Sequence, residues 1–287
     1  MAALSFQTGS RKSSLTFTGD LGRRGIALVH DPSPIPSADL LICESTYGGK
    51  THQPMDQLRT TLADLVQRTS ERGGRVLIPA FSLGRTHAVV DTLREEINSG
   101  RAPRVPIFVD SPLAAAVADV YRLHANGDGA AYDFESDSVR FIRETHESHE
   151  LHRRSEPYVV VASGGMCEGG RIVGHLKQHI DDPRCAIALV SYQAPGTPGR
   201  KLLERGPTVR FHGRKWNKWA EVVDLNGFSS HAAHTDLLDQ LSPLASKIGK
   251  VCLVHGEVER AEALRAGLHE RGFNEVLIPT EGQTVLI

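Results

Sequence analysis

The amino-acid sequence predicts an α/β protein, and three observations support this class. Short runs of β-branched and other apolar residues alternate with segments of helical periodicity, as in layered sheets and helices. The segment 78–93 shows one such unit: an apolar run meets Pro79, a turn follows, and Ala88, Val89 and Leu93 then share one helix face. Several runs also end in an acidic residue or a histidine where a strand gives way to a loop. Strands and helices should therefore alternate along the chain.

The expected strands are short and apolar, as buried strands are. They cover 14–18, 40–44, 75–79, 105–110, 158–162, 186–192, 208–212, 220–225, 250–255 and 275–278. The expected helices carry apolar residues on one face. They cover 54–70, 84–98, 112–125, 136–151, 169–180, 199–205, 233–244 and 258–271. The Pro-rich segment 31–37 should be a loop, because proline removes a backbone donor and biases the preceding residue away from helix.

Composition limits the class of protein. A chain of 287 residues with 40% hydrophobic residues can bury a sizeable core, in one large domain or two smaller ones. The net charge of −1 provides no overall attraction to nucleic acid, so such binding would need a local patch. The four cysteines are scattered and are expected to be reduced, three of them in or beside buried apolar runs. There is no signal-peptide core and no apolar stretch of about 20 residues, so we expect a cytoplasmic protein that does not enter the membrane.

Four segments place an acid or an imidazole at the end of a strand. They are TGDLG (18–22), ESTYG (44–48), FSSH (228–231) and LVHGE (253–257). Taken alone, each has a structural explanation: Asp20 as a turn residue, His255 as a buried core histidine, Glu44 and His231 as capping residues. Taken together they suggest a hydrolytic metal centre, although the His-x-His-x-Asp-His cluster that usually completes such a centre does not occur in the sequence.

Four further strings lie between the second and the third of these segments, at 78–93, 107–124, 159–180 and 191–204. With the four strand-end segments, they resemble the β-CASP branch of the metallo-β-lactamase superfamily, a group of RNA-processing zinc ribonucleases. The resemblance implies a partial metallo-β-lactamase αββα body with an inserted β-CASP α/β cap. Residues 1–48 would end the N-terminal half of the body, 49–229 would form the cap, and 230–287 would return to the body as the RNA-specificity segment. The first 22 residues would be a strand pair just downstream of the absent ligands.

The resemblance also implies residue roles. Asp20 and His255 would be metal ligands in a site that holds two Zn²⁺ ions when complete, with Asp20 bridging the pair. Glu44 and His231 would form the pair that protonates the leaving oxygen, since a histidine with a pKa near 7 suits that task. A histidine at position 255 is also typical of the RNA-acting members. The nearby His234 is expected to be a surface residue.

Contacts to RNA are predicted from two regions and from Arg23, which lies just after Asp20. The glycine-rich string 162–171 lies between a strand and a helix, and Gly164 and Gly165 could let backbone N–H groups approach a phosphate. For this string alone, a tight structural turn is the favoured explanation. A basic segment from Arg200 to Lys218 interleaves cations with tryptophans, which suits phosphates and unpaired bases. The predicted contacts are Arg23, Gly164, Gly165, Arg200, Lys201, Arg214, Lys215 and Trp216. The alternative for the basic segment is a solvated loop that its tryptophans attach to the core.

The leading hypothesis is a zinc-dependent hydrolase of RNA phosphodiester bonds. Because two ligands are fewer than the about three that a catalytic zinc takes from protein, we expect the chain alone to have little or no activity. One alternative is a non-catalytic RNA-binding or scaffold subunit. Another is one half of a split nuclease, with a homodimer or a partner chain supplying the remaining ligands. His146, His149 and His152 recur every three residues and are expected to form a solvated helix face.

Overall fold

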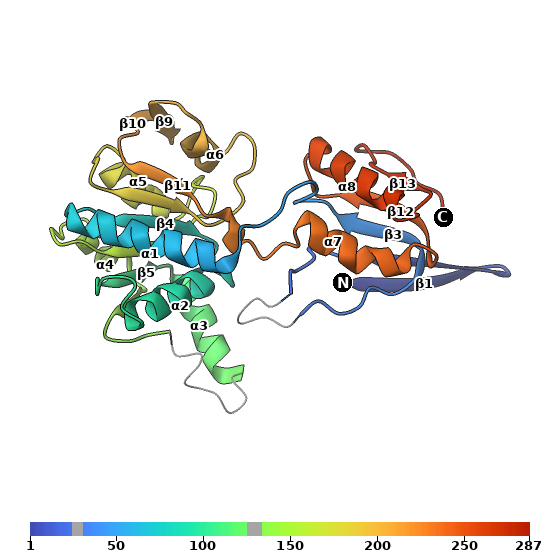
Figure 1. The fold of residues 1–287 in the computed structure, drawn as a ribbon, viewed down its shortest axis with the longest axis horizontal. Helices are drawn as coiled ribbons and strands as arrows, with labels where there is room; N and C mark the ends of the chain where they lie inside the picture. The colour runs from blue at the N-terminus through green and yellow to red at the C-terminus, as the bar shows by residue number, and fades with distance from the viewer. Residues whose placement is uncertain (25–30, 125–133) are drawn as a thin grey trace. The chain divides into compact units, whose positions relative to one another are not determined.

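The computed structural model describes residues 1–24, 31–124 and 134–287, and they form two compact units (Figure 1). The first unit combines Met1–His52 with Ser230–Ile287, and the second is Gln53–Ser229. The boundaries expected from the sequence were 48/49 and 229/230. The chain therefore leaves the first unit, builds the second, and returns to complete the first.

The first unit contains a five-stranded sheet in the order β1-β2-β3-β12-β13. Its strands are β1 (Ala2–Thr8), β2 (Arg11–Phe17), β3 (Ala38–Glu44), β12 (Ile248–Val254) and β13 (Val276–Leu277). The first two form an antiparallel hairpin, which confirms the predicted strand pair, and the remaining pairings are parallel. The helices α7 (His234–Leu241) and α8 (Val258–Glu270) bury Leu237, Leu241 and Leu264 in one core with Leu41 and Cys43 of β3.

The second unit contains a six-stranded parallel sheet in the order β11-β8-β4-β7-β5-β6. Its strands are β4 (Val76–Ala80), β5 (Ile107–Asp110), β6 (Val139–Ile142), β7 (Val159–Ser163), β8 (Ala186–Leu189) and β11 (Glu221–Asp224). Its helices are α1 (Met55–Glu71), α2 (Arg85–Asn98), α3 (Pro112–His124), α4 (Thr145–Leu151), α5 (Ile172–His179) and α6 (Pro198–Leu203). A separate hairpin pairs β9 (Thr208–Phe211) with β10 (Arg214–Asn217). Short 3₁₀ turns lie at Asn226–Phe228 and, in the first unit, at Ser242–Leu244.

Helices cover both faces of this parallel sheet, as its nearly continuous apolar strands require. Leu176 of α5 and Leu202 of α6 share a core with Leu77 and Val160 of the sheet. The alternate residues of the same strands, Ile78 among them, are equally buried and point to the other face, where α1 and α2 contact the strands. This arrangement confirms the predicted α/β class.

All ten expected strands are present, but the helix expected at 136–151 is only partly there. Val139–Ile142 forms the edge strand β6 beside β5, and helix begins at Thr145. The expected solvated histidine face is also wrong in part, because His152 is half-buried with its ring 4.8 Å from that of the buried His175. In this segment, pairing with the neighbouring strand β5 and packing against His175 outweigh the helical pattern of the local sequence.

A buried polar cluster lies in the second unit at the end of β5. Asp110 is fully buried and accepts hydrogen bonds from Arg171 Nη1 at 2.6 Å, from the hydroxyl of Ser148, and from His175 Nε2 at 2.7 Å. These bonds outweigh the effect of burial, which would raise the pKa of Asp110, and hold it below its ordinary value. The carboxylate thus joins β5, α4 and α5.

All four cysteines are buried and reduced, Cys43 and Cys252 in the first unit and Cys167 and Cys185 in the second. Burial raises the pKa of Cys43 and Cys167 to about 12 and also raises that of the other two. Among the residues that the structure describes, no helix has the length and apolar character of a membrane span.

Candidate metal and proton-transfer site

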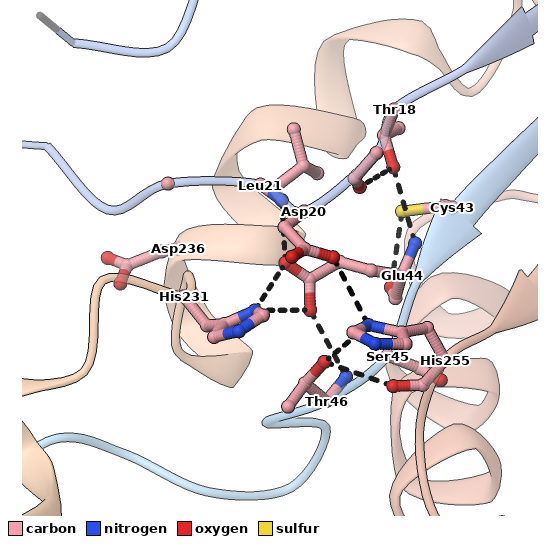
Figure 2. A network of polar contacts seen from close by, with 12 residues as sticks. Thr18, Asp20, Leu21, Cys43, Glu44, Ser45, Thr46, His231, Asp236 and His255 are labelled. Atoms are coloured by element: carbon pink, nitrogen blue, oxygen red, sulfur yellow. Dashed lines mark hydrogen bonds and ion pairs between the residues drawn. The ribbon is translucent and has the colours of Figure 1, made fainter. Parts of the chain in front are cut away.

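The candidate site lies within the first unit, where neighbouring parallel strands end at one edge of the sheet. Val254 is paired with Glu44, and Phe17 is paired with Ile42, so β2, β3 and β12 finish side by side. The residues just beyond these ends therefore converge, as Figure 2 shows. Asp20, Glu44, His231 and His255, which are far apart in the sequence, are brought together at this edge.

Glu44 is the most constrained of the four. Its side chain is buried, and its Oε1 accepts the backbone N–H of Leu21 at 2.6 Å and lies 3.1 Å from Nδ1 of His231. Its Oε2 accepts the backbone N–H of Thr46 at 3.3 Å. Burial alone would raise the pKa of Glu44, but the bonds from His231, Thr46 and Leu21 outweigh it and hold the pKa below its ordinary value. The residue is therefore an anion buried beside an imidazole.

His231 is held by its backbone as well as by Glu44. The backbone of His231 forms an isolated antiparallel β-bridge with Gly22. The carbonyl of the neighbouring Ser230 accepts a hydrogen bond from the N–H of Arg23 at 3.0 Å. His52 Nε2 lies 2.9 Å from the carbonyl oxygen of His231. The side chain of His231 is 22% exposed, so the ring is fixed on one side and reaches solvent on the other. A histidine in this setting can receive and release a proton.

Asp20 and His255 form a second, more exposed pair. Asp20 Oδ1 lies 3.2 Å from His255 Nδ1, and their side chains are 65% and 59% exposed. Asp20 reaches this position because Gly19 turns the chain with a φ of 59° directly after the strand. The ring centroid of His255 is 6.1 Å from that of His231, so the exposed pair and the buried pair are neighbours.

The backbone of His255 is in the left-handed region, with a φ of 58°. This conformation is costly for a non-glycine residue and is held by surrounding contacts. Thr46 donates its hydroxyl to the carbonyl of His255 at 3.1 Å, and Ser45 donates to the carbonyl of Val254 at 2.9 Å. A Cβ at the next residue, Gly256, would lie 2.4 Å from Ser45 Oγ, so glycine is required there. The residues just after β3, Ser45 and Thr46, therefore hold the backbone just after β12 in its conformation.

The donor atoms fit part of a zinc site. Carboxylate and imidazole are both zinc ligands, and Asp20 and His255 face solvent together. Ligand atoms of Asp20, Glu44 and His231 also lie within 4.8 Å of one another. Glu44 is the weaker donor of that set, because its oxygens already accept N–H groups from three residues. Asp20 and His255 are thus the better candidates, and they supply fewer than the about three protein ligands of a catalytic zinc.

The sequence did not predict the roles of Thr46, Ser45 and His52. The first two belong to the string ESTYG, which was used only for its glutamate. His234 was expected at the surface but is half-buried, and its Nδ1 accepts the N–H of Gly49 at 2.9 Å. That bond makes it part of the fold beside the site.

The glycine-rich loop after β7 is a tight turn. A Cβ at Gly164 would lie 2.0 Å from the carbonyl oxygen of Gly169, and one at Gly170 would lie 2.3 Å from that of Ser163. The loop glycines are therefore needed for close backbone packing, whichever ligand the loop contacts.

The predicted basic contacts have internal partners in several cases. Arg200 donates to the carbonyl of Gln193 at 3.2 Å, and Lys201 pairs with Glu204 at 2.9 Å. Trp216 packs against the core of the second unit, and the guanidinium of Arg214 lies 4.6 Å from its ring centroid. The structure therefore favours a core role for this tryptophan. Lys215 is exposed on the same hairpin, whereas Arg23 lies in the first unit.

Comparison with known proteins identifies two domains. The Beta-Casp domain matches residues 87–202, and the Zn-dependent metallo-hydrolase RNA specificity domain matches residues 219–279. A ribonuclease of Thermus thermophilus is 36% identical over 281 residues, which are 95% of this chain and 64% of that protein. RNase aCSPSF2 of Saccharolobus solfataricus is 31% identical over 97% of this chain and 55% of its own length. The transcription termination factor FttA of Methanosarcina mazei is 29% identical over 98% of this chain and 47% of its own. The chain thus spans about half to two thirds of these relatives.

Proposed function

Because the chain belongs to the β-CASP family of the metallo-β-lactamase superfamily, we propose that it contributes to zinc-dependent hydrolysis of RNA phosphodiester bonds. The observation that carries the proposal is the contact between the buried anion Glu44 and the partly exposed His231, next to Asp20 and His255. Such a grouping suits hydrolysis of a phosphodiester, to which a metal and a proton donor can both contribute.

Asp20 and His255 would hold zinc. When bound, zinc would supply charge stabilisation at the phosphoryl oxygens and an activated water. We propose that the complete site would hold two ions and that the carboxylate of Asp20 would be a ligand of both. The left-handed backbone of His255, fixed by Thr46, keeps its imidazole on the side of Asp20.

His231 would deliver the proton to the departing oxygen. Glu44 faces Nδ1 of its ring, so the proton would leave from the other ring nitrogen. The negative charge of Glu44 favours the imidazolium form and holds the ring in one orientation. After each turnover the ring would take up a proton from water, and the same carboxylate would stabilise the resulting charge.

Further zinc ligands would have to come from outside Asp20 and His255. We therefore propose that the 287-residue chain alone hydrolyses RNA poorly, and that activity depends on additional polypeptide, in the same protein or in a partner subunit. A non-catalytic RNA-binding role is the second candidate, and the small number of exposed donors at the site favours it.

The test compares the 287-residue chain with the protein isolated from its natural source, each supplied with zinc and end-labelled single-stranded RNA. We expect cleavage by the natural protein, a loss of about 10²- to 10⁴-fold in His231→Ala, and little cleavage by the chain alone. Cleavage by the chain alone that His231→Ala abolishes would refute the need for further ligands. RNA binding without cleavage by the natural protein would support the scaffold role instead.

A further inference from the structure

The further inference concerns Phe81 in the second unit. This phenylalanine follows β4 directly, and it is 44% exposed although it belongs to a residue type that is usually buried. The last residue of β4, Ala80, is paired with Ser163 at the end of the neighbouring strand β7. Phe81 therefore lies at the carboxyl edge of the parallel sheet, beside the glycine-rich loop.

The strands β4 and β7 are neighbours, and the connection from each of them passes over the other. From β4 the chain continues through α2 to β5, which lies beyond β7, whereas from β7 it continues through α5 to β8, which lies beyond β4. The two connections therefore run in opposite directions. In open α/β sheets, this arrangement leaves a crevice at the carboxyl edge where ligands bind.

The ring of Phe81 rests on the backbone of Gly165. A Cβ at that position would lie 3.0 Å from Cδ2 and Cε2 of the ring and 3.2 Å from Cζ. Gly165 thus allows the ring to lie directly against the loop, which supports one side of it. The other side remains open, because nearly half of the residue is exposed. A supported ring with an open side is suited to stacking.

A cation is linked by hydrogen bonds to the loop that supports this ring. The carbonyl of Gly165 accepts a hydrogen bond from Gln193 Nε2 at 2.9 Å, and the carbonyl of Gln193 accepts one from Arg200 at 3.2 Å. Gln193 itself is buried, so its bonds tie the arginine to the loop under the ring. An aromatic face with a guanidinium nearby matches the alternation of bases and phosphates along a single strand.

We propose that Phe81 is a stacking platform for an unpaired base of single-stranded RNA, with Arg200 facing an adjacent phosphate. The inference rests on the proposed action on RNA and adds a binding residue to it. An exposed apolar residue can also mark a protein interface, and Leu83 is exposed two residues away. The support of the ring by a glycine loop, and the guanidinium linked to that loop through Gln193, favour a base.

The first experiment measures binding of a labelled single-stranded RNA by fluorescence anisotropy. Phe81→Ala should weaken binding about 5- to 150-fold, as expected for the loss of one stacked base. Phe81→Trp should retain affinity, and its added fluorescence should be quenched by RNA. Leu83→Ala is the matched control and should leave affinity unchanged. An RNA with abasic sites should bind weakly and make Phe81→Ala indistinguishable from the unaltered protein.

A second variant moves the ring without removing it. Gly165→Ala places a methyl group against the exposed ring, which can shift at little cost to the fold, so RNA affinity should fall while the unfolding temperature stays the same. Phe81→Ala should also leave the salt dependence of binding unchanged, because it removes no phosphate contact.

The outcomes separate this inference from the proposed function. Unaltered affinity in Phe81→Ala, with RNA bound by the parent chain, would overturn the platform and leave the action on RNA standing. Loss of self-association in Phe81→Ala at constant RNA affinity would overturn it in favour of a protein interface. Failure of the parent chain to bind RNA at all would count against both.

Discussion

Each unit contains a histidine in contact with a buried carboxylate, and the two pairs differ in their access to solvent. In the second unit Asp110 and His175 are both fully buried, 2.7 Å apart, and Arg171 and Ser148 complete the cluster. In the first unit Glu44 is buried, but His231 is 22% exposed and has Asp20 and His255 as neighbours. A proton donor must reach its substrate, whereas a structural pair need not. Exposure of the histidine therefore distinguishes the pair that we propose to be functional from the pair that fixes the fold.

The largest effect on stability is expected from a substitution in the buried pair of Asp110 and His175. Asp110→Asn should reduce the free energy of unfolding by about 3–5 kcal/mol, because it leaves the partly buried guanidinium of Arg171 without its counter-charge. Urea denaturation followed by circular dichroism measures the change. Asp119→Asn is the control: its carboxylate pairs with Arg122 and Arg143 at the surface, and its loss should cost about 0–1 kcal/mol. Equal effects of the two substitutions would mean that Asp110 is not the anchor described.

Glu44→Gln should destabilise the chain less, by about 1–3 kcal/mol. The amide keeps the shape of the side chain, but its NH₂ group must face one of the N–H donors of Leu21, Thr46 or His231. The same urea experiment compares it with Asp110→Asn. A larger loss in Glu44→Gln than in Asp110→Asn would reverse the assignment of the structural pair.

Acid should weaken the second unit through its other histidines. Burial, with smaller contributions from nearby charges, lowers the pKa of His152 and of His179 to about 4 from 6.5. Between these values the unfolded chain binds more protons than the folded one, so the stability present above 6.5 is lost progressively as the pH falls toward about 4. Urea unfolding at a series of pH values measures the slope of the free energy of unfolding against pH. His152→Gln should make the slope shallower, and an unchanged slope would contradict a neutral His152.

The smallest expected effect concerns the strained backbone beside the exposed pair. Thr46→Val removes the hydroxyl that donates to the carbonyl of His255 and should cost about 1 kcal/mol. Thr60→Val on the exposed face of α1 serves as the control and should stay within about 0.5 kcal/mol. If zinc binding, measured by calorimetry, also weakens in Thr46→Val alone, the hydroxyl positions His255 for the metal.

The sequence predicted the α/β class and the strands because their apolar runs end clearly at loops. It missed β6, since four residues gain their strand character only by pairing with β5. The turn of the hairpin at 208–217 is indicated by the sequence, because a residue followed by glycine, here His212 and Gly213, is typical of a two-residue turn. In the structure these residues have φ of 47° and 79°, as such a turn requires.

The candidate site was predicted in its charged residues but not in its supports. Strand ends supplied Asp20, Glu44 and His255, because parallel strands that end at one edge bring such residues together. The bond between Thr46 and His255 depends on the register of β3 against β12, and no local pattern in the sequence encodes that register. The sequence also could not decide whether Trp216 belongs to the core or contacts RNA, because its packing against the core is a tertiary contact.

The buried cysteines can report when each unit of the protein opens. Each unit holds two thiols, and their raised pKa values and burial protect them from alkylating reagents while that unit is closed. Modification can proceed only when a unit opens, so the rate at each cysteine reports the opening of its own unit. Peptide mapping after timed alkylation would therefore follow the two units separately in one chain, without any introduced label.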